Sequence, residues 1–167
     1  MLAPDEFRRV LGHLATGVTI VTTWDSEGRP TGLTASAVTS VSLNPPMILV
    51  CVAHSSQSHP AFHAHGRFAV NILHTDHEQV ARRFASSTHG HEKFEGTGYR
   101  KGAHGLPILD NALAALECTI VHAYPGGDHT IFVGQVEAAD CDADTVFEPL
   151  LYYRGKFGRL DPPAGGR

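Results

Sequence analysis

The chain has 167 residues, of which 42% are hydrophobic and 18% are charged, and its formal net charge at pH 7 is −4. This length suits a single domain with its own core, and the composition is ordinary for a soluble globular protein. The negative charge argues against a nucleic-acid partner bound by phosphate neutralisation. No apolar run approaches the length of a membrane span, and the acidic N-terminal residues do not fit a signal peptide.

The first predicted elements are a helix and a β-hairpin. Residues 4–14 carry apolar side chains at the helical spacing i, i+3, i+4 and i+7. Residues 18–24 are β-branched, and the turn sequence DSEGRP separates them from a predicted partner strand over 31–38. The apolar run MILVCVA, residues 47–53, predicts a further buried strand.

The middle of the chain mixes two short helices with one strand. Residues 58–66 predict a helix with Ser58 as its N-cap, and a strand follows over 67–73. A second helix over 75–86 opens with the spacing of a capping box. The polar, glycine-rich stretch 86–105 predicts a long loop, and loops of this length are usually functional or mobile.

The last third returns to β-structure. Strands over 112–125 and 129–140 flank the turn GGD, and 150–160 predicts a final short strand. Residues 161–167 predict a disordered tail, so we expect one domain over 1–160. Strands dominate without regular alternation with helices, which favours an antiparallel barrel over a doubly wound parallel sheet.

The cysteines and histidines show no compelling metal or disulfide pattern. Cys51, Cys118 and Cys141 lie far apart, and we interpret them as reduced thiols in a cytoplasmic protein. Among the 12 histidines, His59 and His63 have an i,i+4 spacing that can chelate a metal. No cysteine or carboxylate joins them at a suitable spacing, so a metal site is the less favoured interpretation.

Two hydroxyl-rich segments flank the predicted strand 47–53. The sequence TASAVTS, residues 34–40, alternates hydroxyls with small side chains, and AHSSQSHP, residues 53–60, places serines at a predicted helix start. Hydroxyls and backbone N–H groups in such places can hold an anion, and small side chains let a planar ligand approach the backbone. Ordinary turn and capping chemistry explains the same residues, so both interpretations stay open.

No motif of the chain supplies a catalytic group by itself. The glycine patterns of dinucleotide-binding and phosphate-binding loops, the nucleophile elbow and any defensible pair of carboxylates are missing from the sequence. A ligand cradle without a visible acid, base or nucleophile indicates a cofactor that carries the chemistry itself.

The stretch from Ala15 to Phe62 resembles the flavin reductases of two-component monooxygenase systems. It contains G-x-T-x-S-x-x-[TS]-S-[VL]-S followed by N-P-P, and G-D-H-x-[IL]-x-x-G-x-V occurs later in the chain. The resemblance covers residues 5–160 and implies a six-stranded antiparallel Greek-key split barrel with a few peripheral helices. It also implies a homodimer that oxidises NADH or NADPH, reduces FMN or FAD, and hands the reduced flavin to an oxygenase partner.

The resemblance assigns residues to two parts of the site and implies no catalytic acid or base, because hydride would pass directly from nicotinamide to flavin. The flavin-binding residues it implies are Thr34, Ala35, Ser36, Ala37, Thr39, Ser40, Cys51, Val52, Ala53, Ser56, Ser58, Phe84 and Lys93. The nicotinamide-binding residues it implies are His129, Tyr153 and Arg154. Strand alternation predicts that His129 shares a face with Ile131 and Val133 and points into the barrel.

Several of these residues also have an ordinary structural interpretation. Cys51 suits a small buried position, Phe84 suits the apolar face of its helix, and His129 suits a strand surface. Other functions also stay open, namely a non-catalytic flavin-binding module, an oxidoreductase that keeps its flavin and reduces another substrate, and a metal-dependent barrel. Arg100 or Arg154 could meet a 2′-phosphate, so the choice between NADH and NADPH is not predicted.

Overall fold

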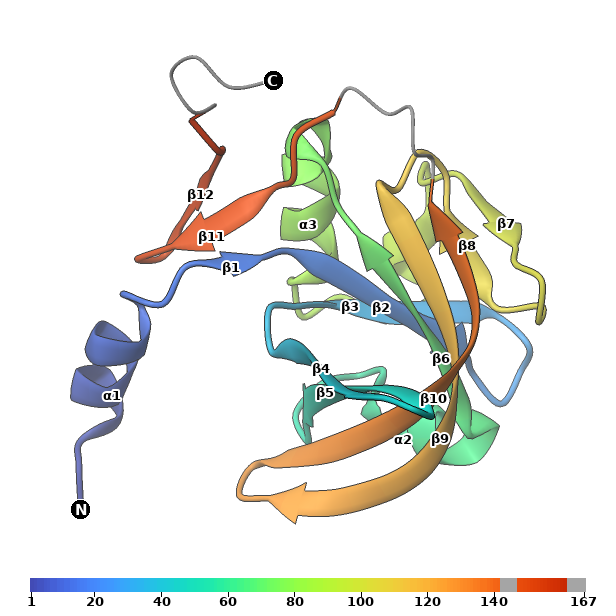
Figure 1. Ribbon diagram of the computed structural model, residues 1–167, viewed down its shortest axis with the longest axis horizontal. Coiled ribbons are helices and arrows are strands. Elements are labelled where there is room, and N and C mark those ends of the chain that lie inside the picture. Colours follow the sequence, from blue (N-terminus) through green and yellow to red (C-terminus); the bar gives the residue numbers. More distant parts are fainter. Residues whose placement is uncertain (142–146, 162–167) are drawn as a thin grey trace.

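The structure, a computed structural model, describes residues 1–141 and 147–161 and is mainly β, as predicted (Figure 1). The predicted tail, apart from its first residue, lies outside the described residues. The helical elements are α1 Pro4–Leu11, α2 His59–His65, η1 Thr75–His77, α3 Glu78–Phe84 and η2 Glu92–Phe94. The strands are β1 Thr16–Gly17, β2 Thr19–Trp24, β3 Pro30–Ala35, β4 Val38–Leu43, β5 Pro46–Ala53, β6 Arg67–Ile72, β7 Tyr99–Lys101, β8 Pro107–Leu109, β9 Ala114–Gly126, β10 His129–Cys141, β11 Leu151–Tyr153 and β12 Lys156–Gly158.

The main sheet is antiparallel and has seven strands, where six were predicted. Its order is β3-β2-β6-β9-β10-β5-β4, and two small sheets, β1-β11-β12 and β7-β8, accompany it. The additional strand is β4, which pairs with β5 across the turn at Asn44 and Pro45. The sequence prediction ran one strand through 31–38, but the chain bends at Ser36 and Ala37, and the hydroxyl-rich residues after the bend form a separate edge strand.

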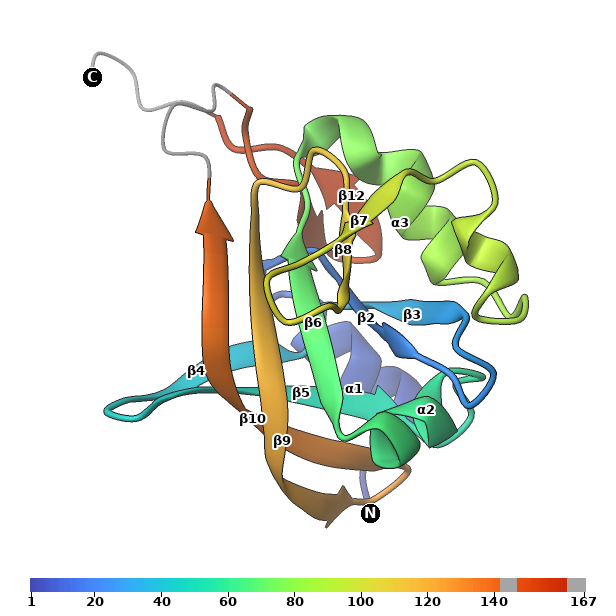
Figure 2. The same cartoon turned by 90° about the vertical axis from the view of Figure 1, so that its right-hand side faces the viewer.

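The sheet coils strongly, yet no ladder joins β3 to β4 among the described residues, so it does not close into a barrel (Figure 2). The long β9–β10 hairpin shows where the bending arises, because its register shifts between Val133 and Gly134 and again between Val136 and Ala138. Such irregularities bend a strand and increase its twist. Gly134 also lets the Phe68 ring of β6 pack against the backbone of β10, since a Cβ atom there would lie 2.6 Å from that ring.

Two of the three hydrophobic clusters hold the sheet and its helices together, and the third, Ala69, Leu106, Ile108 and Ala115, packs β8 and the residue before it against β6 and β9. The larger one fills the concave side of the sheet under α2 and includes Val50, Phe62, Phe68 and Phe132. The second packs α3 against β2 and the segment before β11, and its buried members are Val18, Ile20, Leu73, Ala81, Phe84, Phe94, Leu109 and Leu150. The site described below lies at the edge of this second cluster.

The predicted helices are present, with different ends. α1 stops at Leu11, and η1 precedes α3 because the side chain of His74, rather than a capping box, accepts the N–H of Asp76 at 3.1 Å. Gly66 ends α2 in the left-handed conformation, as its place after the helix predicts. The expected loop 86–105 contains η2 and β7. None of the helices in the described part of the chain is long and apolar enough to span a bilayer.

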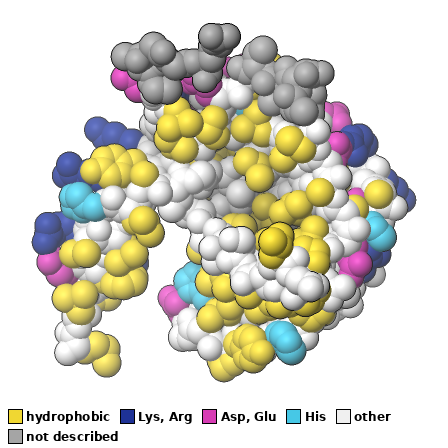
Figure 3. Space-filling model, in the orientation of Figure 1, with side chains coloured by type: hydrophobic (Ala, Val, Ile, Leu, Met, Phe, Trp, Pro, Cys, Tyr) yellow, Lys and Arg dark blue, Asp and Glu magenta, His cyan; other side chains and the backbone are white. Residues whose placement is uncertain are grey.

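The N-terminal helix and the C-terminal hairpin form an arm beside the main sheet (Figure 1). β1 pairs with β11, and β11 pairs with β12, so the predicted single strand over 150–160 is in fact a hairpin. α1 buries none of its residues, and the apolar side chains of its amphipathic face are exposed: Phe7 by 55%, Val10 by 52%, Leu11 by 45% and the following Leu14 by 65%. Figure 3 shows this apolar surface on a lobe set apart from the body.

Candidate flavin site

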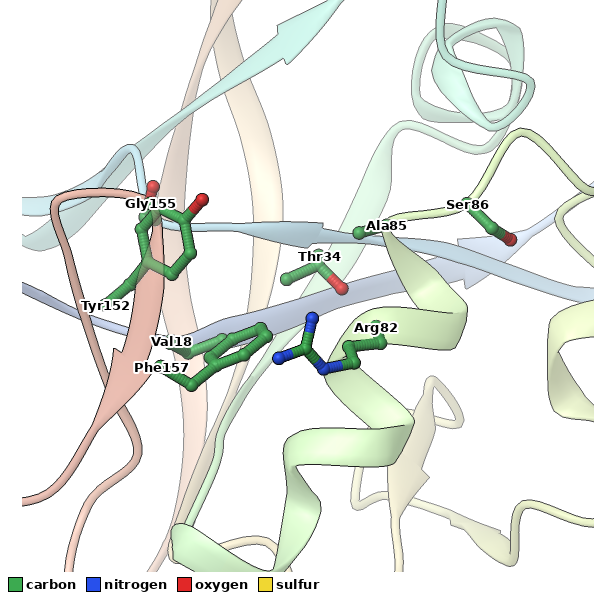
Figure 4. Close-up of a pocket in the computed structure, with 9 residues that line it drawn as sticks. Val18, Thr34, Arg82, Ala85, Ser86, Tyr152, Gly155 and Phe157 are labelled. Carbon is green, nitrogen blue, oxygen red and sulfur yellow. The ribbon is translucent and has the colours of Figure 1, made fainter. Parts of the chain in front are cut away.

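A pocket of about 390 Å³ lies where β3, the end of α3 and the C-terminal hairpin meet (Figure 4). Small, hydroxyl and aromatic side chains line it together with one arginine. These residues are Val18, Thr34, Ser36, Arg82, Ala85, Ser86, Tyr152, Gly155 and Phe157. A second hollow adjoins it on the α1 side, shares Ser36, Tyr152 and Gly155, and includes Ala37 and Arg154.

Hydrogen bonds fix the wall formed by β3 and the bend that follows it. The Thr34 hydroxyl donates to the Ala81 carbonyl of α3 at 2.6 Å, and the Thr19 hydroxyl donates to the Ala35 carbonyl at 2.7 Å. The N–H of Cys51 donates to the Ala37 carbonyl at 3.1 Å, which ties the bend to β5. Ser36 and Ala37 are exposed at this bend, so backbone and small side chains face any ligand there.

The opposite wall combines α3 with the C-terminal hairpin. Nε and Nη2 of Arg82 donate to one carboxylate oxygen of Glu78 at 3.1 and 2.7 Å. The guanidinium lies 4.8 Å from the centroid of the Phe157 ring, which in turn contacts the Tyr152 ring edge-on at 5.4 Å. Figure 4 shows the guanidinium directed into the space between Thr34 and Phe157. A cation over an aromatic face is attracted by the ring quadrupole, so this contact holds the hairpin to α3.

The structure brings several of the sequence-predicted residues together here. Thr34 and Ser36 line the pocket, and Ala37 and Arg154 line the adjoining hollow. Thr39 and Ser40 are exposed on β4 after the bend. The other predicted residues along β5 and the loop after it are half-buried, namely Cys51, Ala53 and Ser56. Burial raises the pKa of the Cys51 thiol, so it stays protonated and unreactive near neutral pH.

Five predicted residues present almost no surface to a ligand, and the first of them is Ala35, which is 6% exposed. Val52 and Phe84 belong to the two hydrophobic clusters. The Ser58 hydroxyl is fully buried, donates to the Gly32 carbonyl at 3.0 Å and lies 2.8 Å from the Thr31 hydroxyl. The last is Lys93, whose side chain is buried as well.

Lys93 is 3% exposed, and its Nζ donates to the Phe84 carbonyl at 3.0 Å. Burial lowers the pKa of this ammonium, yet the contact places its donor on a carbonyl at the end of α3. Cations are favoured near helix C-termini because the last carbonyls carry partial negative charge. Lys93 therefore completes the end of α3 from inside the protein.

His129 does not point into the interior, and that prediction is wrong. Thr130 and Phe132 take the buried positions of β10, so strand alternation leaves the half-buried His129 and Ile131 on the other face. The His129 side chain is 41% exposed, and its Nδ1 lies 2.6 Å from the Asp128 carboxylate. This hydrogen bond lowers the pKa of the Asp128 carboxyl.

Sequence reasoning missed most of the pocket's second wall. It pointed to Tyr153, Arg154 and Gly155, of which Gly155 lines the pocket together with Tyr152 and Phe157, because the hairpin turns at Arg154 with φ +49° and Gly155 with φ +79°. Arg82 was also missed. Its i,i+4 spacing from Glu78 shows that it lies on an exposed helix face, but only the packing of α3 shows that this face borders the pocket.

His59 and His63, the pair with a metal-ligand spacing, contact each other and neighbouring side chains. Nε2 of His59 lies 2.9 Å from the Thr130 hydroxyl, and its ring contacts those of His54 and His63 at 5.1 and 5.2 Å between centroids. Across residues 1–141 and 147–161 no three histidine, cysteine or acidic side chains converge as metal ligands do. Burial and the two neighbouring imidazoles lower the pKa of His59.

A match to a family model defines the class, a flavin reductase-like protein. The chain belongs to the family described as the flavin reductase like domain, whose model matches residues 11–161.

Relatives support this membership along the whole chain. The reductase component of a 4-nitrophenol 4-monooxygenase/4-nitrocatechol 2-monooxygenase from Rhodococcus opacus is 44% identical, over 94% of this chain and 81% of the relative. A protein named actinorhodin polyketide dimerase from Streptomyces coelicolor is 39% identical, over 95% of this chain and 87% of the relative. A solved NADH:FAD oxidoreductase from Streptomyces globisporus C-1027, in complex with NAD and FAD fragments, superposes with a TM-score of 0.87 at 39% identity and 98% coverage of each chain.

Proposed function

We propose that the protein is an NAD(P)H-dependent flavin reductase that reduces FMN or FAD and supplies the reduced flavin to a partner monooxygenase. The observation that carries this proposal is the pocket of Thr34, Ser36, Arg82 and Tyr152 in a chain that belongs to the flavin reductase like family. Relatives whose names specify NADH favour NADH as the reductant. The named monooxygenase components favour an oxygenase partner.

The residues present fit a flavin. Ser36 and Ala37 offer backbone and small side chains on which a planar ring can lie, and the adjoining hollow gives a continuous space for a second ring. Bound flavin supplies the hydride acceptor. The chain's own contribution is to orient the rings, exclude water and direct N–H groups at the flavin edge, so no side chain needs to act as acid or base.

The remaining sequence-predicted residues keep their roles as part of this proposal. Thr39, Ser40, Cys51, Ala53 and Ser56 lie along β4, the end of β5 and the loop after it, beside the bend on which we place the flavin ring. His129, Tyr153 and Arg154 are accessible for the nicotinamide nucleotide. The buried residues Ala35, Val52, Ser58, Phe84 and Lys93 would act through backbone groups or by supporting the walls.

The proposal extends to a cytoplasmic homodimer with a split-barrel domain over residues 1–160. The strong coil of the seven-stranded sheet supports the split-barrel description. A second copy is supported by the uncovered apolar face of α1, which borders the hollow next to the pocket. Covering that face would also close the open side of the site.

Steady-state oxidation of NADH and NADPH, measured with FMN, FAD and riboflavin, tests the function. We expect added flavin to raise nicotinamide oxidation well above the rate in buffer, with the reduced flavin released to oxygen or to an acceptor protein. Flavin binding without turnover would instead indicate a binding module. Turnover with flavin that stays bound through gel filtration would indicate an oxidoreductase that reduces another substrate.

A further inference from the structure

We infer that Arg82 recognises the phosphate of the flavin and makes the enzyme prefer FMN and FAD over riboflavin. This inference rests on the proposed flavin reductase function and specifies which flavins the site accepts. Arg82 is the one charged side chain among the described residues that line the pocket. An arginine that faces a phosphate forms charge-assisted hydrogen bonds, which are stronger than neutral ones.

The guanidinium is held in place and still has donors to offer. Two of its five N–H groups are bound to Glu78, and no other hydrogen bond engages it within the described residues, so three remain. The carboxylate of Glu78 and the ring of Phe157 restrict its position from two sides. This restraint reduces the side-chain entropy that a ligand would otherwise have to immobilise on binding.

Two of the neutral polar side chains that line the pocket donate to carbonyls of α3. The Thr34 hydroxyl donates to the Ala81 carbonyl, and the Ser86 hydroxyl donates to the Arg83 carbonyl at 2.7 Å. An anion accepts hydrogen bonds and therefore needs donors. Ser36 and Tyr152 also line the pocket, but their hydroxyls are neutral, so among these residues Arg82 is the one that can form a charge-assisted hydrogen bond with an anion.

The end of α3 is also prepared for a nearby anion. The carbonyls of a helix's last turn repel negative charge when they are free. Here those of Ala81, Arg83 and Phe84 accept the Thr34 hydroxyl, the Ser86 hydroxyl and the Lys93 amine. The pocket beside Ala85 therefore faces carbonyls whose partial charges are compensated.

The test measures the affinity of two flavins for variants of the two adjacent arginines of α3. Arg82→Gln removes the charge and keeps most of the length, whereas Arg83→Gln removes a guanidinium that binds the Glu95 carbonyl and the Thr97 hydroxyl outside the pocket. FMN and riboflavin differ only by the phosphate, so dissociation constants from flavin fluorescence titration isolate its contribution. Titration also reports on Arg82 independently of turnover.

We expect Arg82→Gln to weaken FMN binding about tenfold and to change riboflavin binding less than twofold, because a charge-assisted hydrogen bond is lost only with FMN. The salt dependence of FMN binding should flatten in the same variant. Arg83→Gln should keep the wild-type preference for FMN.

Equal losses of affinity for FMN and for riboflavin in Arg82→Gln would overturn the inference. They would assign Arg82 a structural role through its contact with Phe157. An equal affinity of the wild-type protein for the two flavins would also overturn it. Either result leaves the proposed function standing if NADH oxidation with riboflavin persists. Absence of turnover with every flavin, together with intact binding, would overturn the proposed function and leave the phosphate assignment in force.

Discussion

At the scale of single residues, the side chains around the pocket differ in what they can still offer to a ligand. Thr34 and Ser86 donate to carbonyls of α3, so their hydroxyls contribute to the wall. Ser36 is exposed at the bend after β3, where the pocket and the adjoining hollow meet. A substitution at Ser36 therefore acts on the ligand space more directly than one at Thr34.

Replacing Ser36 by leucine should fill this space and weaken flavin binding. Overpacking a preformed slot costs about 1 to 3 kcal/mol, which corresponds to roughly tenfold or more in the dissociation constant. Fluorescence titration with FMN measures the effect, and Ser87→Leu, at an exposed position that does not line the pocket, is the matched control. An unchanged titration in a folded Ser36→Leu protein would place the flavin elsewhere.

His77, at the junction of η1 and α3, links stability to pH. Burial and the neighbouring His74 lower its pKa to about 4, against a smaller opposing effect of Asp76. As the pH falls below the ordinary value of 6.5, the unfolded chain takes up a proton before the folded chain does. The contribution of neutral His77 to stability is therefore complete above pH 6.5 and is lost between there and about pH 4.

Urea midpoints measured from pH 7.5 down to pH 4.5 should reveal this loss. We expect the wild-type midpoint to fall with pH in this range and His77→Gln to show a shallower fall, because glutamine takes up no proton. His122→Gln removes an exposed histidine from β9 and serves as the control. Identical slopes for the wild type and His77→Gln would contradict the prediction.

At the scale of elements, the packing of β6 and β9 side chains against β10 depends on a glycine, Gly134. A Cβ atom on Gly134 would lie 2.6 Å from the Phe68 ring and 2.8 Å from the Cβ of Cys118, whereas one on Gly17 would meet nothing within 4 Å. Gly17 therefore provides a matched control on a different strand. Both glycines have ordinary backbone conformations, so the comparison isolates packing from backbone strain.

Gly134→Ala should destabilise the protein by about 1 to 3 kcal/mol through overpacking of this contact. Gly17→Ala should change stability by less than about 0.5 kcal/mol, as open surface positions usually do. Equilibrium urea unfolding followed by circular dichroism measures both. A Gly134→Ala protein as stable as the control would mean that the Phe68 ring can move away from β10 at little cost.

At the scale of the whole molecule, the arm of α1 and the C-terminal hairpin presents apolar surface that this chain alone does not cover. The exposed Phe7, Val10, Leu11 and Leu14 form one face of the helix and its continuation. Large contiguous apolar patches of this kind mark interaction sites in soluble proteins. A second copy is the occupant we propose, because it would also close the open side of the pocket.

Leu11→Glu should therefore convert a dimer into a monomer and weaken flavin binding at the same time. A charge buried without a partner at an interface costs several kcal/mol, enough to dissociate an ordinary homodimer. Sedimentation velocity gives the oligomeric state, and Ser87→Glu adds the same charge at an exposed position outside α1. A wild-type protein that sediments as a monomer at micromolar concentration would exclude the proposed dimer.

Local patterns were enough to predict the mainly β composition, the presence of an amphipathic N-terminal helix, the tight hairpin at GGD and the family. Each depends on neighbouring residues, through side-chain periodicity, turn chemistry or a run of motif residues. Thr34 and Ser36 of the hydroxyl-rich segment 34–40 line the pocket, and their contact with a flavin stays a prediction. The bend at Ser36 and Ala37, which makes β4 a seventh strand, was not predicted. The hydroxyl-rich residues there fit a continuous strand as well as a turn.

Only the tertiary structure decided which residues meet. It places Arg82 of α3 beside Phe157 and Tyr152 of the C-terminal hairpin, and it buries Ser58 and Lys93, whose polar groups had suggested ligand contacts. A hydroxyl or an ammonium that donates to a protein carbonyl is not available to a ligand. That carbonyl belongs to another segment of the chain, so only the packed structure identifies it. Sequence spacing determines the face of a helix or strand, but the packing of elements determines what that face touches.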